Sequence, residues 1–416
     1  MRILQVIHSF PPDNWSGSEI YALRLSQALA RTDEVAVFCR RADPGRPEFE
    51  VDREVFKNLP IYRLNNNFLS VKRFEDIYRH EAINQAFCQV LNEWNPDIVH
   101  FHHLTCLSTD FPVLCKDRGM GTCYTLHDYW LLCQRGQFLD LNLEPCQGPG
   151  TARCLTCLQE QVVGPASSLI SRLWGYHQIH KRRRHIAKIS RFIDRFIAPS
   201  RFLADFHVKC GFDDERIEVL GYGFDHSLYS TSKKASPFLR FGFIGSIMVS
   251  KGTEIAIQAF RLVAGDELRL TINGRYFPYH GLKGYMDQIK TSSGGDQRIQ
   301  IEGEFRHDRV QDIFSEIDVL IFPSIWYENS PLTIQEAFLT GTPVLVSDFG
   351  AMPELARPGQ GCLLFQKGNA EDLADKIRLL CDDRSMIETL RRTMPSVKSI
   401  AENASELKEI YDDITR

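Results

Sequence analysis

Residues 323–354 read PSIWYENSPLTIQEAFLTGTPVLVSDFGAMPE, and their pattern is the most informative in the sequence. Ser330 is a residue type that caps helix N-termini, and Pro331 suits the first helical position. Gly341 suits the C-terminal cap, and Pro343 prevents the helix from continuing. The stretch therefore predicts a helix over about residues 331–340, placed between two apolar strands.

The start of this helix is where chemistry is expected. A helix N-terminus presents free backbone N–H groups and partial positive charge, which makes it an anion site. Glu328 lies in the loop before the helix and Glu336 lies inside it, eight positions later. Two isolated glutamates would be read as solvated surface residues. Here a capped helix, a Pro-Ser pair at a strand end and a second glycine loop at Gly350 accompany them, which favours a binding site.

The same succession of strand, loop and helix recurs along the chain, so we expect an α/β protein with mostly parallel sheets. Ser16 and Glu19 have the spacing of a capping box at the start of the first helix. The apolar segments that predict strands are Ile3–Ile7, Val35–Cys39, Asp97–Phe101, Gly121–Leu126, Phe196–Ala198, Leu239–Ile244, Leu268–Ile272, Val319–Phe322 and Val344–Ser347.

The length of 416 residues is too great for one typical core and fits two domains. We expect a Rossmann-like domain over residues 1–225, with a cysteine-rich insert at about 130–160. A second Rossmann-like domain should cover residues 226–395. The charged segment 396–416 should form a helix that packs back on the first domain.

The net charge of −4 gives no basic field of the kind that binds nucleic acid. The apolar run at the N-terminus is too short for a secretion signal, and no run of about 18 apolar residues predicts a membrane span. We therefore expect a cytoplasmic protein with reduced cysteines, and any contact with the inner face of the cytoplasmic membrane should be peripheral.

Glu328 and Glu336, separated by seven residues in the context ENSP, resemble the signature of retaining glycosyltransferases of the family-4 type. The resemblance implies the GT-B fold, in which two Rossmann-like doubly wound domains face a central cleft. It implies that Glu336 hydrogen-bonds the ribose hydroxyls of a nucleotide and that Glu328 acts catalytically beside the donor sugar. By the same resemblance, the donor and its diphosphate should also meet Asn329, Ser330, Pro331, Leu332 and Thr333, with backbone N–H groups of residues 331–333 by the diphosphate.

Two further loops carry the resemblance. FIGSIMVSKG, residues 243–252, is similar to a loop in which an arginine and a lysine neutralise the diphosphate. Lys251 matches the lysine, Ser246 stands where the arginine is often found, and Arg275 is the candidate replacement. HSFPPDNWSGSEIYALRLSQAL, residues 8–29, resembles the family's glycine-rich first loop, with Gly17 and Ser18 at the usual Gly-Gly position.

Histidines follow two of the predicted strands in the first half. The resemblance assigns His127 a catalytic role, because the family places a histidine at this strand end with its ring on the donor sugar. Asp128 comes directly after it. We expect Asp128, His102 and His103 on the acceptor side.

Four cysteines, Cys133, Cys146, Cys154 and Cys157, fall in the insert that follows His127. Four thiols in a reduced compartment are compatible with structural tetrahedral zinc, and equally with free thiols or a disulfide-capable loop. The family resemblance implies that catalysis itself requires no metal or other cofactor.

The segment at about 167–190 has Leu169, Ile170, Leu173 and Trp174 at helical spacing and continues into KRRRH. Such a segment either lies on an anionic membrane or packs its apolar side into the core and keeps its basic side solvated.

The expected function is retaining transfer of a sugar from a UDP- or GDP-sugar to the hydroxyl of a glycan or lipid-linked acceptor. Such a reaction belongs to cell-surface polysaccharide, O-antigen or glycolipid synthesis. Two alternatives stay open: a nucleotide-sugar epimerase with the same fold, and a non-catalytic nucleotide-sugar-binding or assembly protein.

Overall fold

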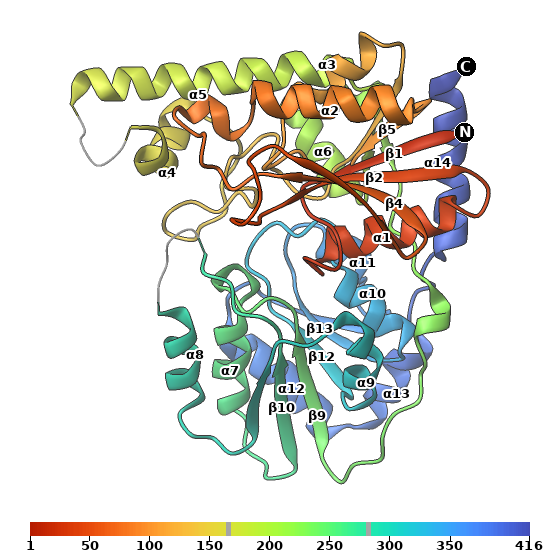
Figure 1. The fold of residues 1–416 in the computed structure, drawn as a ribbon. Coiled ribbons are helices and arrows are strands. Elements are labelled where there is room, and N and C mark those ends of the chain that lie inside the picture. Colours follow the sequence, from red (N-terminus) through yellow and green to blue (C-terminus); the bar gives the residue numbers. More distant parts are fainter. Residues whose placement is uncertain (164–167, 280–283) are drawn as a thin grey trace. The chain divides into compact units, whose positions relative to one another are not determined.

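The computed structural model describes residues 1–163, 168–279 and 284–416, and within them the chain forms two compact units (Figure 1). Unit 1 comprises residues 1–141, 146–224 and 398–416, and unit 2 comprises residues 142–145 and 225–397. Each unit is built on a sheet of its own that helices flank. The prediction of an α/β fold with two Rossmann-like units is confirmed.

Unit 1 contains an eight-stranded sheet with the order β3-β4-β2-β1-β5-β6-β7-β8, parallel except for the edge pair β3 and β4. Strands β3, β4 and β8 have no counterpart among the predicted strands. Three of the six residues of β3 are charged, and β8 has only three residues. The strands are β1 (Arg2–Ile7), β2 (Glu34–Arg41), β3 (Val51–Phe56), β4 (Leu59–Asn65), β5 (Ile98–Phe101), β6 (Gly121–Thr125), β7 (Arg195–Ala198) and β8 (Ile217–Val219).

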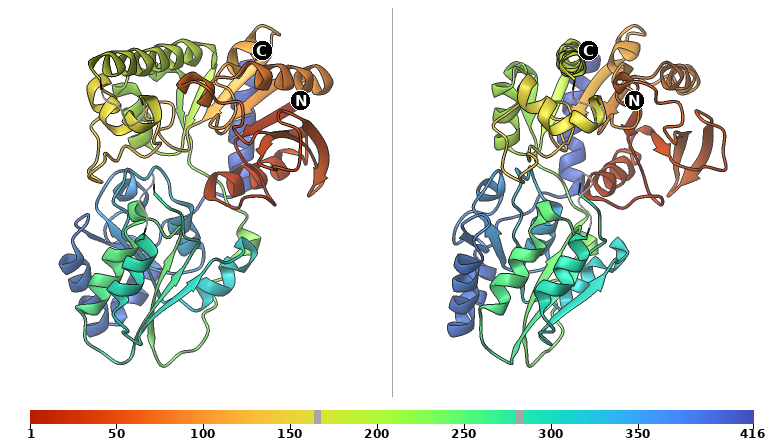
Figure 2. Two further views of the ribbon diagram at one scale, coloured as in Figure 1. Left: turned by 60° about the vertical axis from the view of Figure 1, so that its left-hand side comes forward. Right: turned by 90° about the vertical axis from the view of Figure 1, so that its left-hand side faces the viewer.

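The helices of unit 1 are α1 (Gly17–Leu29), α2 (Glu81–Trp94), α3 (Phe111–Lys116), α4 (Thr151–Val162), α5 (Leu169–Ile189), α6 (Arg201–Lys209) and α14 (Ile400–Thr415). The last of these packs against α1 and β6 (Figures 1 and 2). Tyr21 donates a hydrogen bond to Asn403 Oδ1 at 2.9 Å. Gly223 comes so close to this helix that an added Cβ would lie 2.5 Å from the Cβ of Asn403. A glycine is therefore required where the chain passes α14.

Unit 2 contains a six-stranded, wholly parallel sheet with the order β11-β10-β9-β12-β13-β14. Its strands are β9 (Leu239–Ile244), β10 (Leu268–Asn273), β11 (Ile299–Gly303), β12 (Val319–Phe322), β13 (Val344–Ser347) and β14 (Cys362–Phe365). Its helices are α7 (Thr253–Arg261), α8 (Tyr285–Ser293), α9 (Val310–Ser315), α10 (Leu332–Leu339), α11 (Met352–Leu355), α12 (Ala370–Asp382) and α13 (Ser385–Arg392).

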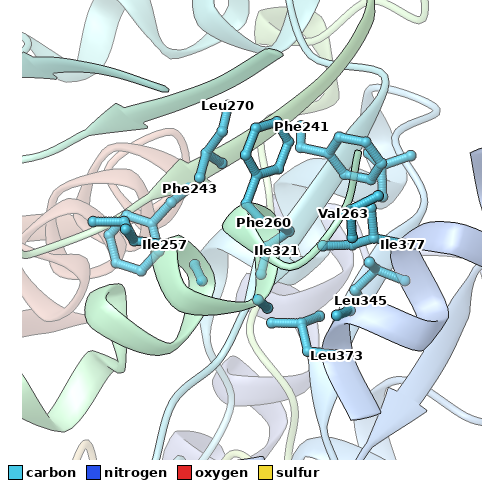
Figure 3. Close-up of a cluster of buried hydrophobic side chains, with 14 of the residues drawn as sticks. Phe241, Phe243, Ile257, Phe260, Val263, Leu270, Ile321, Leu345, Leu373 and Ile377 are labelled. Carbon is cyan, nitrogen blue, oxygen red and sulfur yellow. The ribbon is translucent and has the colours of Figure 1, made fainter. Parts of the chain in front are cut away.

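Both faces of the unit 2 sheet are buried, as expected for parallel strands that read as continuous apolar runs. On one face, Phe260 of α7 and Ile377 of α12 pack against Phe241 and other strand residues (Figure 3). The rings of Phe241 and Phe260 meet edge to face at 6.0 Å. A second cluster, built around Phe314 of α9 and residues of α10, covers the opposite face. This packing fixes the strand ends from which the loops of unit 2 start.

Two helix starts differ from the prediction. Ser16 is the N-cap residue of α1, but its hydroxyl donates to Asn14 Oδ1, and the Glu19 carboxylate is engaged by other side chains, so no capping box forms. Helix α10 starts at Leu332 with Pro331 as its N-cap residue, instead of Ser330, whose hydroxyl accepts a hydrogen bond from Gln335. The first turn of α10 therefore has no side-chain cap.

No helix in the described part of the chain is both long enough and apolar enough to span a bilayer. Helix α5, with 21 residues, is the basic helix predicted at about 167–190; residue 167 itself lies outside the described residues. Its buried residues are Gly175, Ile179, Arg182, Ile186 and Ile189. The apolar residues at its start are exposed, whereas Ile179, Ile186 and Ile189 further along pack into the core, as in the core-facing alternative.

Candidate active site

In unit 2, loops follow the carboxyl ends of the neighbouring strands β9, β12 and β13. The backbone N–H of Ile325 donates to Ser250 O at 3.0 Å, and that of Ala351 donates to Glu328 O at 3.2 Å. Gly252 has a φ of +69°, and an added Cβ would lie 2.0 Å from Pro323 O. These contacts join the three loops into one surface at the edge where ligands bind in open parallel sheets.

Glu328 and Lys251 meet at this edge. The ammonium of Lys251 lies 2.6 Å from Glu328 Oε1, and the carboxylate is almost completely buried. Ser324 and the indole N–H of Trp326 donate to the same oxygen, at 2.8 and 2.7 Å. Because all three donors go to Oε1, the second oxygen, Oε2, remains as an acceptor for a ligand.

Lys251 keeps N–H donors that the ion pair with Glu328 does not use. An ammonium carries three N–H donors, and Glu328 takes one of them. The ammonium also lies 5.2 Å from the ring centroid of Trp326, at the distance of a cation–π contact. The arrangement holds a cation at the strand ends while leaving it able to donate to an anion.

Glu336, inside α10, is the other buried glutamate of the predicted site. Tyr229 donates to its Oε1 at 3.0 Å, and the Nε2 of His307 lies 3.2 Å from the same oxygen. Burial raises the pKa of Glu336 to about 7, against the opposing effect of the Tyr229 hydroxyl. The carboxyl therefore changes its charge near neutral pH.

The predicted residues at the start of α10 lie together in the same segment. Asn329 and Ser330 are buried, and Asn329 Oδ1 accepts the backbone N–H of Ser330 at 2.7 Å. Pro331 has no N–H, so the expectation of a donor at this position is wrong. The uncapped N–H groups of Leu332 and Thr333 carry the partial positive charge of the helix start.

Ser246 stands where the family often has an arginine, and Arg275, the candidate replacement, has its guanidinium on another partner. Ser246 is half-buried, and the N–H of the next residue, Ile247, donates to Arg275 O at 2.9 Å, so Arg275 lies beside this loop. Its guanidinium, however, faces Glu304 at 3.7 Å, and both side chains are more than half exposed. Arg275 could reach an anion only by leaving this weak surface pair.

In unit 1, His102, predicted on the acceptor side, and His127, predicted as catalytic, belong to one hydrogen-bonded chain. His102 Nε2–H donates to Gln5 Oε1 at 2.6 Å, which leaves His102 Nδ1 as the acceptor from His127 Nε2–H at 2.9 Å. His127 Nδ1 then accepts from Tyr222 at 2.6 Å. Burial lowers the pKa of both histidines well below the usual value, so both rings are neutral. Both ring nitrogens of His127 are engaged inside the protein, and a sugar hydroxyl could bond this ring only by exchange with one of its partners.

Two carboxylates lie next to this chain. His103 Nε2–H donates to Asp128 Oδ2 at 3.1 Å, and His8 Nε2 lies 3.2 Å from Glu19 Oε1. The rings of His8 and His103 are 4.7 Å apart, so the two pairs adjoin. Burial disfavours both carboxylates, but the histidines outweigh it and lower the pKa of Asp128 and of Glu19.

Gly17 and Ser18 start α1, and Ser18 donates to Glu19 Oε2 at 2.9 Å. The sequence analysis did not identify the residues that hold the predicted ones in place: His8, Glu19, Tyr222, Tyr229, His307 and Trp326. His8 carried a usable signal, because it directly follows a strand as His102 does. Tyr222, Tyr229 and His307 contact predicted residues far away in sequence, whereas Glu19 and Trp326 contact predicted residues one and two positions away.

The four cysteines of the insert lie in one region. Burial raises the pKa of the Cys133 thiol to about 11, with Cys154 adding to the effect. Burial also raises the pKa of Cys154 and Cys157, with Cys146 adding to the effect in both. All four are free thiols. Across the described residues, no three His, Cys, Asp or Glu side chains are grouped so that they could hold a metal ion. The zinc site gains no support from this arrangement and stays a prediction.

Solved structures share this fold over nearly the whole chain. Sucrose-phosphate synthase from Thermosynechococcus elongatus superimposes with a TM-score of 0.70 at 18% identity, over 99% of this chain and 98% of that one. HepE from Anabaena, in complex with UDP and glucose, gives a TM-score of 0.69 at 17% identity, over 99% of both chains. At this identity the likeness establishes the GT-B fold.

Curated relatives match over part of their length. The D-inositol 3-phosphate glycosyltransferase of Nocardia farcinica is 25% identical over 58% of this chain and 54% of its own length. The lipopolysaccharide core mannosyltransferase LpsB of Rhizobium meliloti is 24% identical over 50% of this chain and 60% of its own. The chain thus spans little more than half the length of these relatives.

Family models cover both halves. Residues 15–228 match the model described as Glycosyltransferase Family 4, and residues 239–383 match the model described as Glycosyl transferases group 1. The second match contains Lys251, Glu328 and Glu336, and the first contains the histidine chain. The chain is therefore a member of the group 1, family-4 glycosyltransferases.

Proposed function

We propose that the protein transfers a sugar from a nucleotide-diphosphate sugar to an acceptor hydroxyl and retains the anomeric configuration. The observation that carries this proposal is the joint placement of Lys251, Glu328 and Glu336 around the uncapped start of α10. A cation, a helix N-terminus and a carboxylate suited to a ribose diol are the groups that a nucleotide diphosphate requires.

Each of these groups has a task in the proposed reaction. Ionised Glu336 accepts hydrogen bonds from the ribose hydroxyls. Lys251 donates its remaining N–H groups to the diphosphate, and the N–H groups of Leu332 and Thr333 face the charge that develops on the leaving phosphate. Glu328 offers Oε2 to a hydroxyl of the donor sugar or to positive charge near its reacting carbon.

The neighbours in structure and sequence support the donor and acceptor classes. HepE has been solved in complexes with UDP-glucose and with UDP and glucose, which favours a UDP-sugar for this chain as well. LpsB is a lipopolysaccharide core mannosyltransferase, which supports a glycan or lipid-linked acceptor and a place in cell-surface polysaccharide, O-antigen or glycolipid synthesis. A GDP-sugar is the second donor class to be tested.

A thermal-shift panel of UDP-, GDP-, ADP- and TDP-sugars tests the donor. A ligand present at about 100 times its dissociation constant adds about 2.7 kcal/mol of stability, so one base class should raise the melting temperature clearly. The Glu336→Gln variant should lose that shift. If no nucleotide sugar stabilises the protein, the proposed donor site is wrong.

Product analysis separates transfer from the alternatives. Incubation with a labelled donor and a mixture of glycan acceptors should yield a glycoside with the anomeric configuration of the donor. An epimerised nucleotide sugar without transfer would establish the epimerase alternative. Binding without hydrolysis or transfer would favour the non-catalytic alternative.

We also propose that the start of α5 contacts an anionic membrane surface from one side. Leu169, Ile170, Leu173 and Trp174 are 74%, 80%, 59% and 45% exposed in successive turns. Exposed cations follow along the same helix, Arg184 among them. Apolar side chains flanked by cations suit insertion among anionic lipid headgroups.

Co-sedimentation with vesicles tests this contact. The protein should bind vesicles that contain phosphatidylglycerol at low salt and bind less at high salt, because screening weakens the attraction. The Leu169→Ser/Ile170→Ser variant should lose binding. Leu379→Ser, at a residue of α12 that is 40% exposed, is the matched control. Equal binding of all three proteins would contradict the proposal.

A further inference from the structure

We infer that unit 1 carries a second binding site, for a phosphate-bearing ligand, in a hollow between α4, α5 and the end of α6. The hollow has a volume of about 600 Å³ and is lined by residues 147–153, Arg183, Lys209 and Cys210. This volume lies within the range of about 300–1,000 Å³ that is typical of small-molecule pockets. The hollow shares no lining residue with the donor and acceptor sites described above, and the inference does not depend on the proposed transfer.

Three cations from three separate elements line this hollow: Arg153 in α4, Arg183 in α5 and Lys209 in α6. Arg183 donates a hydrogen bond to the hydroxyl of Thr151 at 3.4 Å, and Arg153 donates to the sulfur of Cys146 at 3.7 Å. Both acceptors are neutral groups. No aspartate or glutamate is among the described lining residues. Three like charges that face one hollow repel each other, and a bound anion removes that repulsion.

Another hollow of unit 1 differs from this one in the charge of its lining. It has about 290 Å³ and also contains cations, Arg79 and Lys188, but Glu81 and Asp110 lie in the same lining. Arg79 forms an ion pair with Asp110 at 2.7 Å. The charges there are balanced within the protein. Of these two hollows, the one beside α4 has the excess of positive charge.

The backbone of the hollow also favours an anion. The hollow contains the start of α4, a helix of 12 residues whose N-cap residue, Gly150, has no side chain to cap the first turn. The N–H groups of Thr151 and Ala152 therefore add partial positive charge to that of the three cations. The cations and the helix start are independent features that select the same kind of ligand.

A phosphate fits this lining better than a carboxylate does. Two guanidinium groups offer paired N–H donors, which match phosphate oxygens bidentately, and the third cation balances a dianion. The volume leaves room for a group attached to the phosphate. The phosphate can belong to a lipid headgroup or to a soluble ester, and the two sources are separable by experiment.

Cys210 gives a local readout, because it lines the hollow and is half-buried. We would measure its rate of alkylation by a maleimide, by mass spectrometry, with pyrophosphate in one arm and with phosphatidate or phosphatidylcholine vesicles in the other. At a ligand concentration ten times the dissociation constant, alkylation of Cys210 should slow about tenfold. Cys88, which does not line the hollow, should react at an unchanged rate. Pyrophosphate bound at the donor site would not alter this readout.

The variant Arg153→Gln/Lys209→Gln removes two exposed cations of the lining and should abolish the protection, taken as the ratio of rates with and without ligand. Arg201→Gln removes an exposed cation of α6 that is not in the lining, and it should keep the protection. Protection by pyrophosphate assigns a soluble phosphate, and protection by phosphatidate vesicles alone assigns a headgroup. No protection in either arm, or equal protection in the double variant, would overturn the inference.

Discussion

Two arrays of buried side chains lie at strand ends, the Lys251–Glu328 array of unit 2 and the histidine array of unit 1. The first is charged and the second is neutral. In unit 2, Lys251 and Glu328 form an ion pair at 2.6 Å, and the carboxylate is almost completely buried. In unit 1, His102 and His127 share a hydrogen bond at 2.9 Å as neutral rings. The first array can respond to a charged ligand, because an arriving anion competes with Glu328 for the cation. The second fixes the orientation of its groups without changing its charge.

The largest effect should come from breaking the ion pair of unit 2. The Lys251→Met variant leaves the Glu328 carboxylate buried without its cation, which should cost about 3–5 kcal/mol of the free energy of unfolding. Urea denaturation measures this cost. The Lys251→Met/Glu328→Gln variant should recover most of it, because the uncompensated charge is then gone.

Lys234→Met is the matched control, since Lys234 also lies 2.6 Å from a glutamate, Glu316, but both side chains are more than half exposed. Its cost should stay within about 1 kcal/mol. If Lys251→Met costs no more than Lys234→Met, the contrast between the two arrays is smaller than the geometry indicates.

The difference between the arrays also explains which features could be predicted from the sequence. Lys251, Glu328 and Glu336 lie in local patterns, a glycine loop and a helix start, whose chemistry is contained in a few consecutive residues. The central strands are predictable for the same reason, because each is one apolar run. The chain from Tyr222 through His127 and His102 to Gln5 joins four segments, and only the fold brings them together. The edge strand β3 was missed because three consecutive charged residues, 52–54, interrupt its apolar run.

The next largest effect concerns transfer itself. Glu328→Gln keeps the size of the side chain and the acceptor for Trp326, so the protein should fold. It removes the negative charge from the proposed donor site, and the rate of transfer should fall about 10²–10³-fold. Steady-state kinetics with the donor found in the thermal-shift panel measures it. Glu316→Gln, at an exposed glutamate, should leave turnover unchanged, and a folded Glu328→Gln variant with normal turnover would exclude the catalytic assignment.

A smaller effect should appear in the pH dependence of nucleotide binding. The carboxyl of Glu336 has its pKa raised by burial from the ordinary 4.5 to about 7, and only its ionised form accepts both ribose hydroxyls. Affinity should therefore rise about tenfold between about pH 6 and pH 8, as the ionised fraction grows. Calorimetric titration with the nucleotide at several pH values measures this rise.

Stability should run in the opposite direction. Between about pH 4.5 and 7 the folded protein holds a proton on Glu336 that the unfolded chain has lost, so the contribution to stability falls as pH rises through this window. Glu336→Gln should flatten both profiles. The ring of His307 lies 3.2 Å from the carboxylate. The His307→Asn variant removes the imidazole, and if it abolishes the pH dependence of binding, the histidine rather than Glu336 is responsible.

The smallest effect should come from unit 1. Tyr222→Phe removes the hydrogen bond to His127 Nδ1 but keeps the ring stacked on His127 at 5.5 Å. A neutral hydrogen bond of this kind contributes about 0.5–1.5 kcal/mol, well below the ion pair of unit 2. Urea denaturation measures the cost, and NMR of the histidine side chains reports whether His127 keeps Nε2 protonated toward His102. A loss as large as that of Lys251→Met would mean that the histidine array contributes as much to the free energy of unfolding as the ion pair does. The two arrays would then not differ in their energetic role.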